Sequence, residues 1–196
     1  MLDISKDFSF QKKLLWFNGF LPMAFLLFDF FTDRLGANPP EAVIRTTGII
    51  AILFLALSLL ATPAAKIFKQ PWILKHRRWL GLWCFYYALL HMISYSLFDK
   101  SLNLALIFED IVKRPFILLG FLGFSILIPL AITSSNTMIS WLGAAKWKKL
   151  HKLTYVVPPL VVIHYWMIVK SDIFYPAFFA VVFAVLLLYR LRSLRF

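Results

Sequence analysis

The chain contains 196 residues, of which 61% are hydrophobic and 18% aromatic, and its mean hydropathy is +0.79. A soluble domain is about 45 to 50% apolar, so this composition indicates an integral membrane protein. The formal net charge of +12 does not indicate nucleic-acid binding, because the 21 lysines and arginines stand in short clusters between apolar runs and form no continuous basic face. With one cysteine, Cys84, the sequence excludes an internal disulfide, a CxxCH haem-attachment site and a thiolate metal cage.

The N-terminal segment, residues 1–31, begins with lysines followed by an apolar stretch, as a signal peptide does. Its apolar part is too long for a signal peptide, and it lacks a cleavage site of small residues. We therefore expect it to be a retained first membrane helix.

Six apolar runs approach or reach the length of about 20 residues that a helix needs to cross a bilayer. They are apolar on both faces and lack the alternation of barrel strands, so each is predicted to be a helix. The connections are too short for a folded domain outside the membrane. The sequence therefore predicts an all-α bundle of six transmembrane helices in a single domain, 1–196. In chain order the predicted helices are 14–31, 46–62, 79–98, 115–132, 150–169 and 174–189.

Basic residues are unequally divided between the two sides of this predicted bundle. Because loops rich in lysine and arginine stay in the cytoplasm, both termini are predicted to be cytoplasmic. The cytoplasmic side would hold Lys6, Lys12, Lys13, Lys66, Lys69, Lys75, Arg77, Arg78, Lys146, Lys148, Lys149, Lys152, Arg190, Arg192 and Arg195. The outer side would hold Arg34, Arg45, Lys100, Lys113, Arg114 and Lys170.

Two of the four histidines, His91 and His164, lie well inside predicted helices. An ionisable residue inside the membrane is by default a functional-site hypothesis. His91 comes twelve positions after Trp79 and His164 fourteen after Leu150, which at about 1.5 Å per residue puts them roughly 18 and 21 Å from the cytoplasmic end. The two rings can therefore face each other in the outer half of the bundle.

Two facing neutral imidazoles suit the axial positions of a haem b, because helix bundles build cofactor sites from inward-facing side chains. The haem would then lie between the third and fifth predicted helices. The alternative is that each ring is a core histidine bonded to a neighbouring hydroxyl, for example that of Ser94 or Tyr165. A matched pair on alternate outward helices favours the haem.

His151, in KKLHKL at the cytoplasmic rim, has two interpretations. It is either an interfacial histidine among snorkelling lysines, or a ligand or support for a second redox group about 20 Å below the first. Thirteen steps of about 100° leave His151 and His164 some 220° apart on an ideal helix, unless Pro158 and Pro159 bend it. The fourth histidine, His76, is expected to be a solvated residue in a basic loop, and a pair with His151 is the alternative.

Other polar residues are weaker candidates. Arg77 and Arg78 could meet a flavin phosphate or a quinone head group, but the cytoplasmic location of positive charge explains them by default. Arg45 and Arg114, on the outer side, are candidate partners for haem propionates, because guanidinium suits carboxylate. The hydroxyl-rich segment TSSNT (133–137) is predicted to be a loop that ends a helix.

Several phrases of the sequence together resemble a known family. They are GIIAILFLALSLLATPAA (48–65), RRWLGLWCFYYALLHMISY (77–95), RPFILLGFLGFSILIPLAITS (114–134), WLGAAKWKKLHKLTYVV (141–157) and HYWMIVKS (164–171). They are similar to MsrQ, also called YedZ, the haem-binding membrane subunit of bacterial periplasmic methionine sulfoxide reductase systems. That family lies within the ferric-reductase-like transmembrane group. The likeness covers nearly the whole chain in collinear order.

The resemblance implies a multi-pass electron carrier of the bacterial inner membrane with one or two haems b. Such a protein takes electrons from the quinone pool or a flavin reductase, with bound FMN as a further cofactor. It passes them to a periplasmic molybdopterin partner, MsrP, which reduces methionine sulfoxide in oxidised proteins. Matched residue by residue, the family's haem histidines are His91, His164 and His151.

The sequence has neither a nucleotide-binding motif nor a loop of domain size, which agrees with a subunit that only relays electrons. No GxGxxG follows a strand and the chain stops seven residues beyond Tyr189, so it is not expected to collect hydride from NADPH itself. No outward loop reaches domain size, so the substrate chemistry is expected in a partner. The alternatives are a membrane ferric or oxygen reductase fed by a separate flavin protein, and a non-redox transporter or assembly factor whose histidines bind protons or metal.

Overall fold

The computed structural model describes residues 7–169 and 171–193. Lys6, Lys170 and Arg195, which contributed to the predicted orientation, lie outside the described residues. Every regular element in the described part of the chain is helical, which confirms the all-α class. The chain forms two compact units, Met1–Asp99 and Lys100–Phe196, and each is described by itself.

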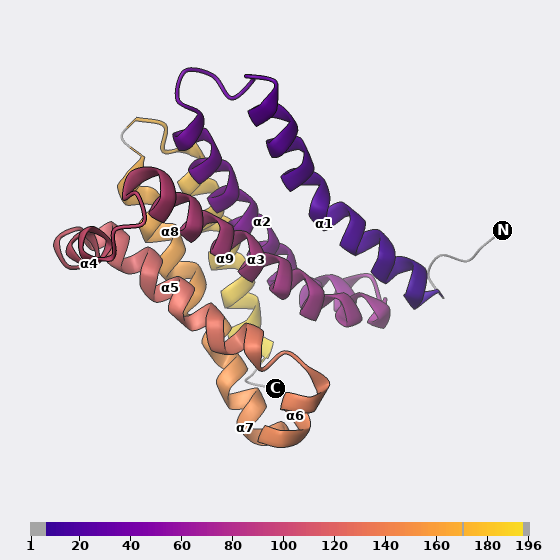
Figure 1. Ribbon diagram of the computed structural model, residues 1–196. Coiled ribbons are helices and arrows are strands. Elements are labelled where there is room, and N and C mark those ends of the chain that lie inside the picture. The colour runs from indigo at the N-terminus through magenta and orange to yellow at the C-terminus, as the bar shows by residue number, and fades with distance from the viewer. Residues whose placement is uncertain (1–6, 170, 194–196) are drawn as a thin grey trace. The chain divides into compact units, whose positions relative to one another are not determined.

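The first unit contains three long helices, and α2 packs along α3 (Figure 1). The predicted helices 14–31, 46–62 and 79–98 are all present, and each belongs to a longer helical segment. The side chain of Asn38 caps the start of α2, and prolines occupy its first turn, where no helical N–H is needed. The elements are α1 (Phe8–Phe31), α2 (Pro39–Ile67), the 3-10 helix η1 (Pro71–His76), α3 (Arg77–Ser94) and the π-helical turn η2 (Tyr95–Asp99).

Helix α3 is joined to α1 by Tyr87, whose side chain is fully buried. Its hydroxyl donates to the backbone oxygen of Gly19 at 2.7 Å and accepts from the backbone nitrogen of Met23 at 3.1 Å. These two backbone groups are four residues apart and would ordinarily pair with each other, so the hydroxyl enters the hydrogen-bond ladder of α1. Gly19 also lets the Trp83 ring lie against α1, because a Cβ there would overlap the indole.

The second unit contains a core of three helices, in which α5 and α9 both pack against α8 (Figure 1). Helix α5 has the bounds that the sequence predicts, and α9 covers the predicted helix 174–189. Three shorter helices, α4, α6 and α7, were not predicted. The elements are α4 (Leu104–Lys113), α5 (Pro115–Ile132), α6 (Asn136–Leu142), α7 (Ala144–His151), the 3-10 helix η3 (Lys152–Tyr155), α8 (Val157–Ile168) and α9 (Phe174–Ser193).

The predicted helix 150–169 is not continuous. Helix α7 ends at His151, η3 follows, and α8 begins only at Val157. Pro158 and Pro159 cause the interruption, because they have no backbone N–H to bond to the carbonyls four residues earlier. The chain passes through a tighter 3-10 turn at this point, which also changes the helical phase between the residues on either side.

Five helical segments in the described ranges are long and apolar enough to cross a membrane, so the chain is a multi-pass membrane protein. Helix α8, with 12 residues, rises only about 18 Å. The count of six spans therefore stays a prediction, as do the cytoplasmic termini. The five segments are Phe8–Phe31, Pro39–Ile67, Pro71–Asp99, Pro115–Ile132 and Phe174–Arg192.

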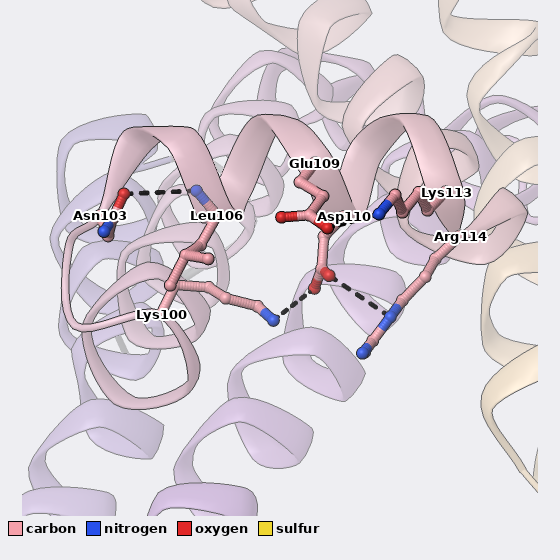
Figure 2. A network of polar contacts seen from close by, with 7 residues as sticks. All are labelled: Lys100, Asn103, Leu106, Glu109, Asp110, Lys113 and Arg114. Carbon is pink, nitrogen blue, oxygen red and sulfur yellow. Dashed lines mark hydrogen bonds and ion pairs between the residues drawn. The ribbon is translucent and has the colours of Figure 1, made fainter.

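Helix α4 is too short to cross a bilayer, and the side chain of Asn103 caps its start. Leu104, Phe108 and Val112 are spaced four residues apart, so they share one face of the helix, and they are 80%, 70% and 68% exposed. Figure 2 shows the charged residues of α4, in which Glu109 pairs with Lys113 and Asp110 pairs with Lys100 and Arg114. A short helix with an exposed apolar stripe beside charged residues is typical of the membrane interface.

Removal of the Tyr87 hydroxyl tests how α1 is held. Tyr87→Phe is expected to lower the free energy of unfolding by about 1–2 kcal/mol, because buried backbone groups of α1 lose a hydrogen-bond partner. Thermal unfolding in detergent would show a lower melting temperature. Tyr86→Phe is the control, since its ring packs against the same cluster. Equal melting temperatures for the two variants would contradict a structural role for the Tyr87 hydroxyl.

Candidate functional site

His91, on α3, lies against α2, and its Nδ1 is 2.8 Å from the backbone oxygen of Ile44. Because a carbonyl oxygen can only accept, Nδ1 carries the proton and donates it, and the lone pair of the neutral ring is on Nε2. Gly48 stands beside this contact. A Cβ at Gly48 would lie 3.0 Å from Nδ1 and 3.2 Å from Cε1 of the ring. The imidazole therefore lies directly on the backbone of α2.

His164, on α8, has a similar contact with α5. Its Nδ1 is 2.6 Å from the backbone oxygen of Phe116, so this ring also donates from Nδ1 and keeps its lone pair on Nε2. Gly120 stands beside the ring, and a Cβ there would lie 2.8 Å from Cε1 and 2.9 Å from Nδ1. The fit of ring to backbone is tighter here than at His91.

The same local arrangement thus occurs once in each unit. In both rings the Nδ1 partner is a backbone carbonyl, whereas the alternative from the sequence was a hydroxyl partner. A neutral imidazole with its Nδ1–H held by a carbonyl and a basic Nε2 is the usual form of a metal-ligating histidine. Because His91 and His164 belong to different units, their pairing across one haem stays a prediction.

His151, the last residue of α7, contacts the end of α5. Its Nε2 is 3.0 Å from Oγ1 of Thr133, and this hydroxyl donates to the backbone oxygen of Pro129 at 2.6 Å. A hydroxyl has one proton, so Nε2 of His151 donates in this contact. In the neutral ring the lone pair is then on Nδ1, which is the opposite tautomer to that of the other two rings. Iron ligation through Nε2 would require this ring to give up its contact with Thr133.

Trp147 completes the surroundings of His151. Its ring stacks on the imidazole, with the centroids 4.1 Å apart, and its Nε1 donates to the backbone oxygen of Thr133 at 2.9 Å. Thr133 is buried. Because its hydroxyl contacts His151 and its backbone oxygen accepts from Trp147, it joins two side chains of α7 to the end of α5. Residues 133–135 follow the end of α5, as predicted, but α6 begins at Asn136, within the predicted loop. The hydroxyl of Thr133 also contacts a histidine.

His76 is buried, with 7% of its surface exposed, so the expectation of a solvated histidine was wrong. Its Nε2 is 2.8 Å from Oε1 of Gln11 on α1. The rings of Phe8 and Trp72 pack on it, with centroid distances of 5.5 and 5.8 Å. Helix α1 covers this residue, and a contact with a distant helix could not be inferred from the basic residues beside it in the sequence.

Arg45 and Arg114, the two arginines predicted to lie on the outer side, are both paired with carboxylates of their own units. Arg45 is 2.8 Å from Glu41 in an exposed pair. Arg114 Nε is 3.3 Å from Oδ1 of Asp110, whose Oδ2 is 2.6 Å from Lys100 Nζ, as Figure 2 shows. These contacts give no support to the prediction that the arginines bind haem propionates.

Among the described residues, no group of three or more histidine, cysteine, aspartate or glutamate side chains could hold a metal ion. The candidate ligands in this part of the chain are therefore single histidines on separate helices. Sequence reasoning identified these histidines but missed the residues that contact them. The glycines were the available signal, since glycine is a poor helix former. The missed residues are Ile44, Gly48, Phe116, Gly120 and Thr133.

Comparison with known proteins gives consistent matches. Residues 47–163 match the family described as ferric reductase like transmembrane component, a range that contains His91 and His151 and ends one residue before His164. Proteins named "protein-methionine-sulfoxide reductase heme-binding subunit MsrQ" are similar over most of their length. That of Caulobacter vibrioides is 42% identical over 90% of this chain and 84% of its own. Those of Herminiimonas arsenicoxydans and Pectobacterium carotovorum are 42% and 39% identical, over 91% and 94% of this chain and 83% and 92% of their own.

The contact between Thr133 and His151 can be tested by removing the hydroxyl. Thr133→Val is expected to lower the free energy of unfolding by about 1–2 kcal/mol, because the Nε2–H of His151 loses its acceptor. The melting temperature measures this effect, and the ¹⁵N spectrum of histidine-labelled protein should show a changed His151 ring. Ser134→Ala is the matched control, since that hydroxyl donates to a backbone oxygen of its own helix. An unchanged His151 signal in Thr133→Val would refute the contact.

Proposed function

The chain belongs to the MsrQ family of haem-binding subunits of protein-methionine-sulfoxide reductases, and from this premise we propose that it is a b-type haem electron-transfer subunit. The relatives at about 40% identity support the role, because their names assign haem binding and a methionine sulfoxide reductase partnership to proteins of nearly the same length. The substrate chemistry then belongs to the partner.

His91 and His164 are the residues that would hold the haem iron. The observation that carries this proposal is the shared state of the two rings, each with Nδ1–H bonded to a helix carbonyl and a lone pair on Nε2. The residues present therefore fit a haem, which when bound supplies an iron that accepts and releases one electron. The chain's own contribution is to hold each ring in one tautomer, with Nδ1–H bonded to the backbone of a neighbouring helix.

The proposed electron donor is the quinone pool or a flavin reductase, with FMN as a further cofactor. The proposed acceptor is a periplasmic molybdopterin reductase of the MsrP type, which reduces methionine sulfoxide in oxidised proteins. The proposed location is the bacterial inner membrane, with both termini in the cytoplasm. The unequal division of basic residues supports this orientation.

His151 is the third proposed haem residue, as ligand or support of a second haem b. Its contact with Thr133 favours the supporting role, because Nε2 is engaged as a donor. A second haem would need the ring to ligate through Nδ1 or to leave Thr133.

A second candidate function is direct reduction of ferric iron or oxygen. The observation that favours it is the match to a family described as ferric reductase like. The two candidates share the haem and differ in the acceptor.

Replacement of the proposed ligands tests haem binding. His91→Ala and His164→Ala are each expected to abolish the low-spin haem spectrum, because a six-coordinate iron needs both imidazoles. Absorption spectra of purified protein, with haem supplied during expression, measure the Soret band and the reduced α band. His76→Ala is the matched control, since its Nε2 is bonded to Gln11, and it should keep the haem. A normal spectrum in either ligand variant would refute the proposed pair.

The role of His151 is decided by stoichiometry. His151→Ala is expected to keep the haem bound by His91 and His164, because those two rings are held on other helices. Haem and flavin per protein should be compared with those of the unchanged protein. Loss of one haem out of two would establish a second site, and an unchanged haem content would support the supporting role.

The acceptor is tested by reoxidation of the reduced protein. Addition of the periplasmic reductase with methionine sulfoxide is expected to reoxidise the haem faster than ferric iron or oxygen alone. Stopped-flow absorbance at the α band measures the rate. The reductase without methionine sulfoxide is the control, since it can accept electrons only until it is itself reduced. No acceleration over iron or oxygen would favour the second candidate function.

A further inference from the structure

A helix carbonyl is normally difficult for a donor on a neighbouring helix to reach. The backbone oxygen of residue i already accepts from the nitrogen of residue i+4, although it has a second lone pair. The Cα–Cβ bonds of a helix tilt toward its N-terminus, so the side chain of residue i+4 leans back over this oxygen. A large donor such as an imidazole therefore needs residue i+4 to leave the approach open, and glycine does so.

Both histidine contacts have this requirement and meet it in the same way. In the first unit the accepting oxygen belongs to Ile44 and the residue four positions later is Gly48. In the second unit the oxygen belongs to Phe116 and the residue four positions later is Gly120. We call each pair of carbonyl and glycine an imidazole seat. The histidine follows its carbonyl by 47 positions in the first unit and by 48 in the second.

We propose that Gly48 and Gly120 are positioning residues, which hold His91 and His164 in the tautomer and orientation that iron ligation requires. Each glycine acts by leaving open the carbonyl four residues before it, so that Nδ1–H donates there and the Nε2 lone pair is directed away from the seat. The role of the rings as ligands rests on the proposed function. The seat itself is a property of the protein without its cofactor.

The two seats differ in how closely the glycine approaches the imidazole ring, so alanine at the two positions should have effects of different size. A Cβ at Gly120 would lie 2.8 Å from the ring of His164, a distance at which something must move. A Cβ at Gly48 would lie 3.0 Å from the ring of His91, so a shift of a few tenths of an ångström would accommodate it. Gly120→Ala should therefore disturb its histidine more than Gly48→Ala does.

The chain contains a matched control glycine in each unit. Gly123 lies one turn after Gly120 on the same face of α5, and a Cβ there would lie 3.2 Å from Val161 Cγ1 on α8. Gly81 lies on α3, and a Cβ there would lie 3.6 Å from Ser58 Oγ on α2. Gly123→Ala and Gly81→Ala therefore add the same methyl group to the same helix pairs without touching a histidine.

The first readout is independent of the cofactor. Haem-free protein labelled with ¹⁵N-histidine has four labelled rings, which single histidine variants assign. The resonances of His91 and His164 are expected to show a protonated Nδ1 and an unprotonated Nε2. Gly120→Ala should shift or broaden the His164 signals and Gly48→Ala should shift the His91 signals less. The two control variants should leave both rings unchanged.

The second readout is the haem itself. The orientation of the axial rings sets the low-spin electron paramagnetic resonance spectrum, and the hydrogen bond at Nδ1 sets ligand basicity and hence the reduction potential. Gly120→Ala is expected to shift the g values and the potential or to lose haem, with a smaller shift for Gly48→Ala. Protein yield and melting temperature matched to the control variants show that the change is local.

The positioning role of the two glycines and the proposal that His91 and His164 bind the haem can be tested separately. The inference is overturned if both glycine variants match their controls in the ¹⁵N and haem spectra. If His91→Ala and His164→Ala keep a normal haem while the glycine variants still change the ¹⁵N signals, the proposed ligands are wrong, and with them the positioning role. If Gly120→Ala does not accumulate, Gly48→Ala decides by the same two readouts, because its milder overlap allows folding.

Discussion

The hydrogen bond from an imidazole Nδ1–H to a helix carbonyl decides what His91 and His164 can do. Inside lipid there is no water to pair with either ring nitrogen, so an intramembrane histidine must find its partner within the protein. A carbonyl satisfies this need without competing for the second nitrogen, because it accepts and cannot donate. With the proton on Nδ1, the lone pair of the neutral ring is on Nε2, which leaves that nitrogen for a haem iron. The contact is possible because Gly48 and Gly120, on the facing helices, have no Cβ that would meet the imidazole rings.

The same constraint explains other polar contacts between the apolar helices. The Tyr87 hydroxyl uses both of its hydrogen-bonding capacities on the backbone of α1, where the missing Cβ of Gly19 lets the neighbouring Trp83 ring lie against the helix. The buried His76 bonds to Gln11, which belongs to a different helix. In each case a polar side chain within one unit is paired across two helices, so the contact also fixes how those helices pack.

The three proposed haem residues, His91, His164 and His151, are not equivalent in this structure. His151 stands just before the 3-10 turn that Pro158 and Pro159 impose, and its neighbours are a hydroxyl and an indole from residues close to the end of α5. Its proton is on Nε2, where the rings on α3 and α8 have theirs on Nδ1. This difference supports one pair of matched ligands and a third histidine with a separate role.

The sequence by itself determined the membrane class and the approximate positions of the long helices, and it singled out His91 and His164 as candidates, because hydropathy and depth along a helix are local properties. It also carried enough family-specific phrases to indicate the MsrQ family. Only the tertiary structure decided the partners of each ring, the burial of His76 and the break in the helix 150–169. Those features depend on residues about 18 to 65 positions apart, or on how a proline pair redirects the backbone, and neither leaves a periodic signal in the chain.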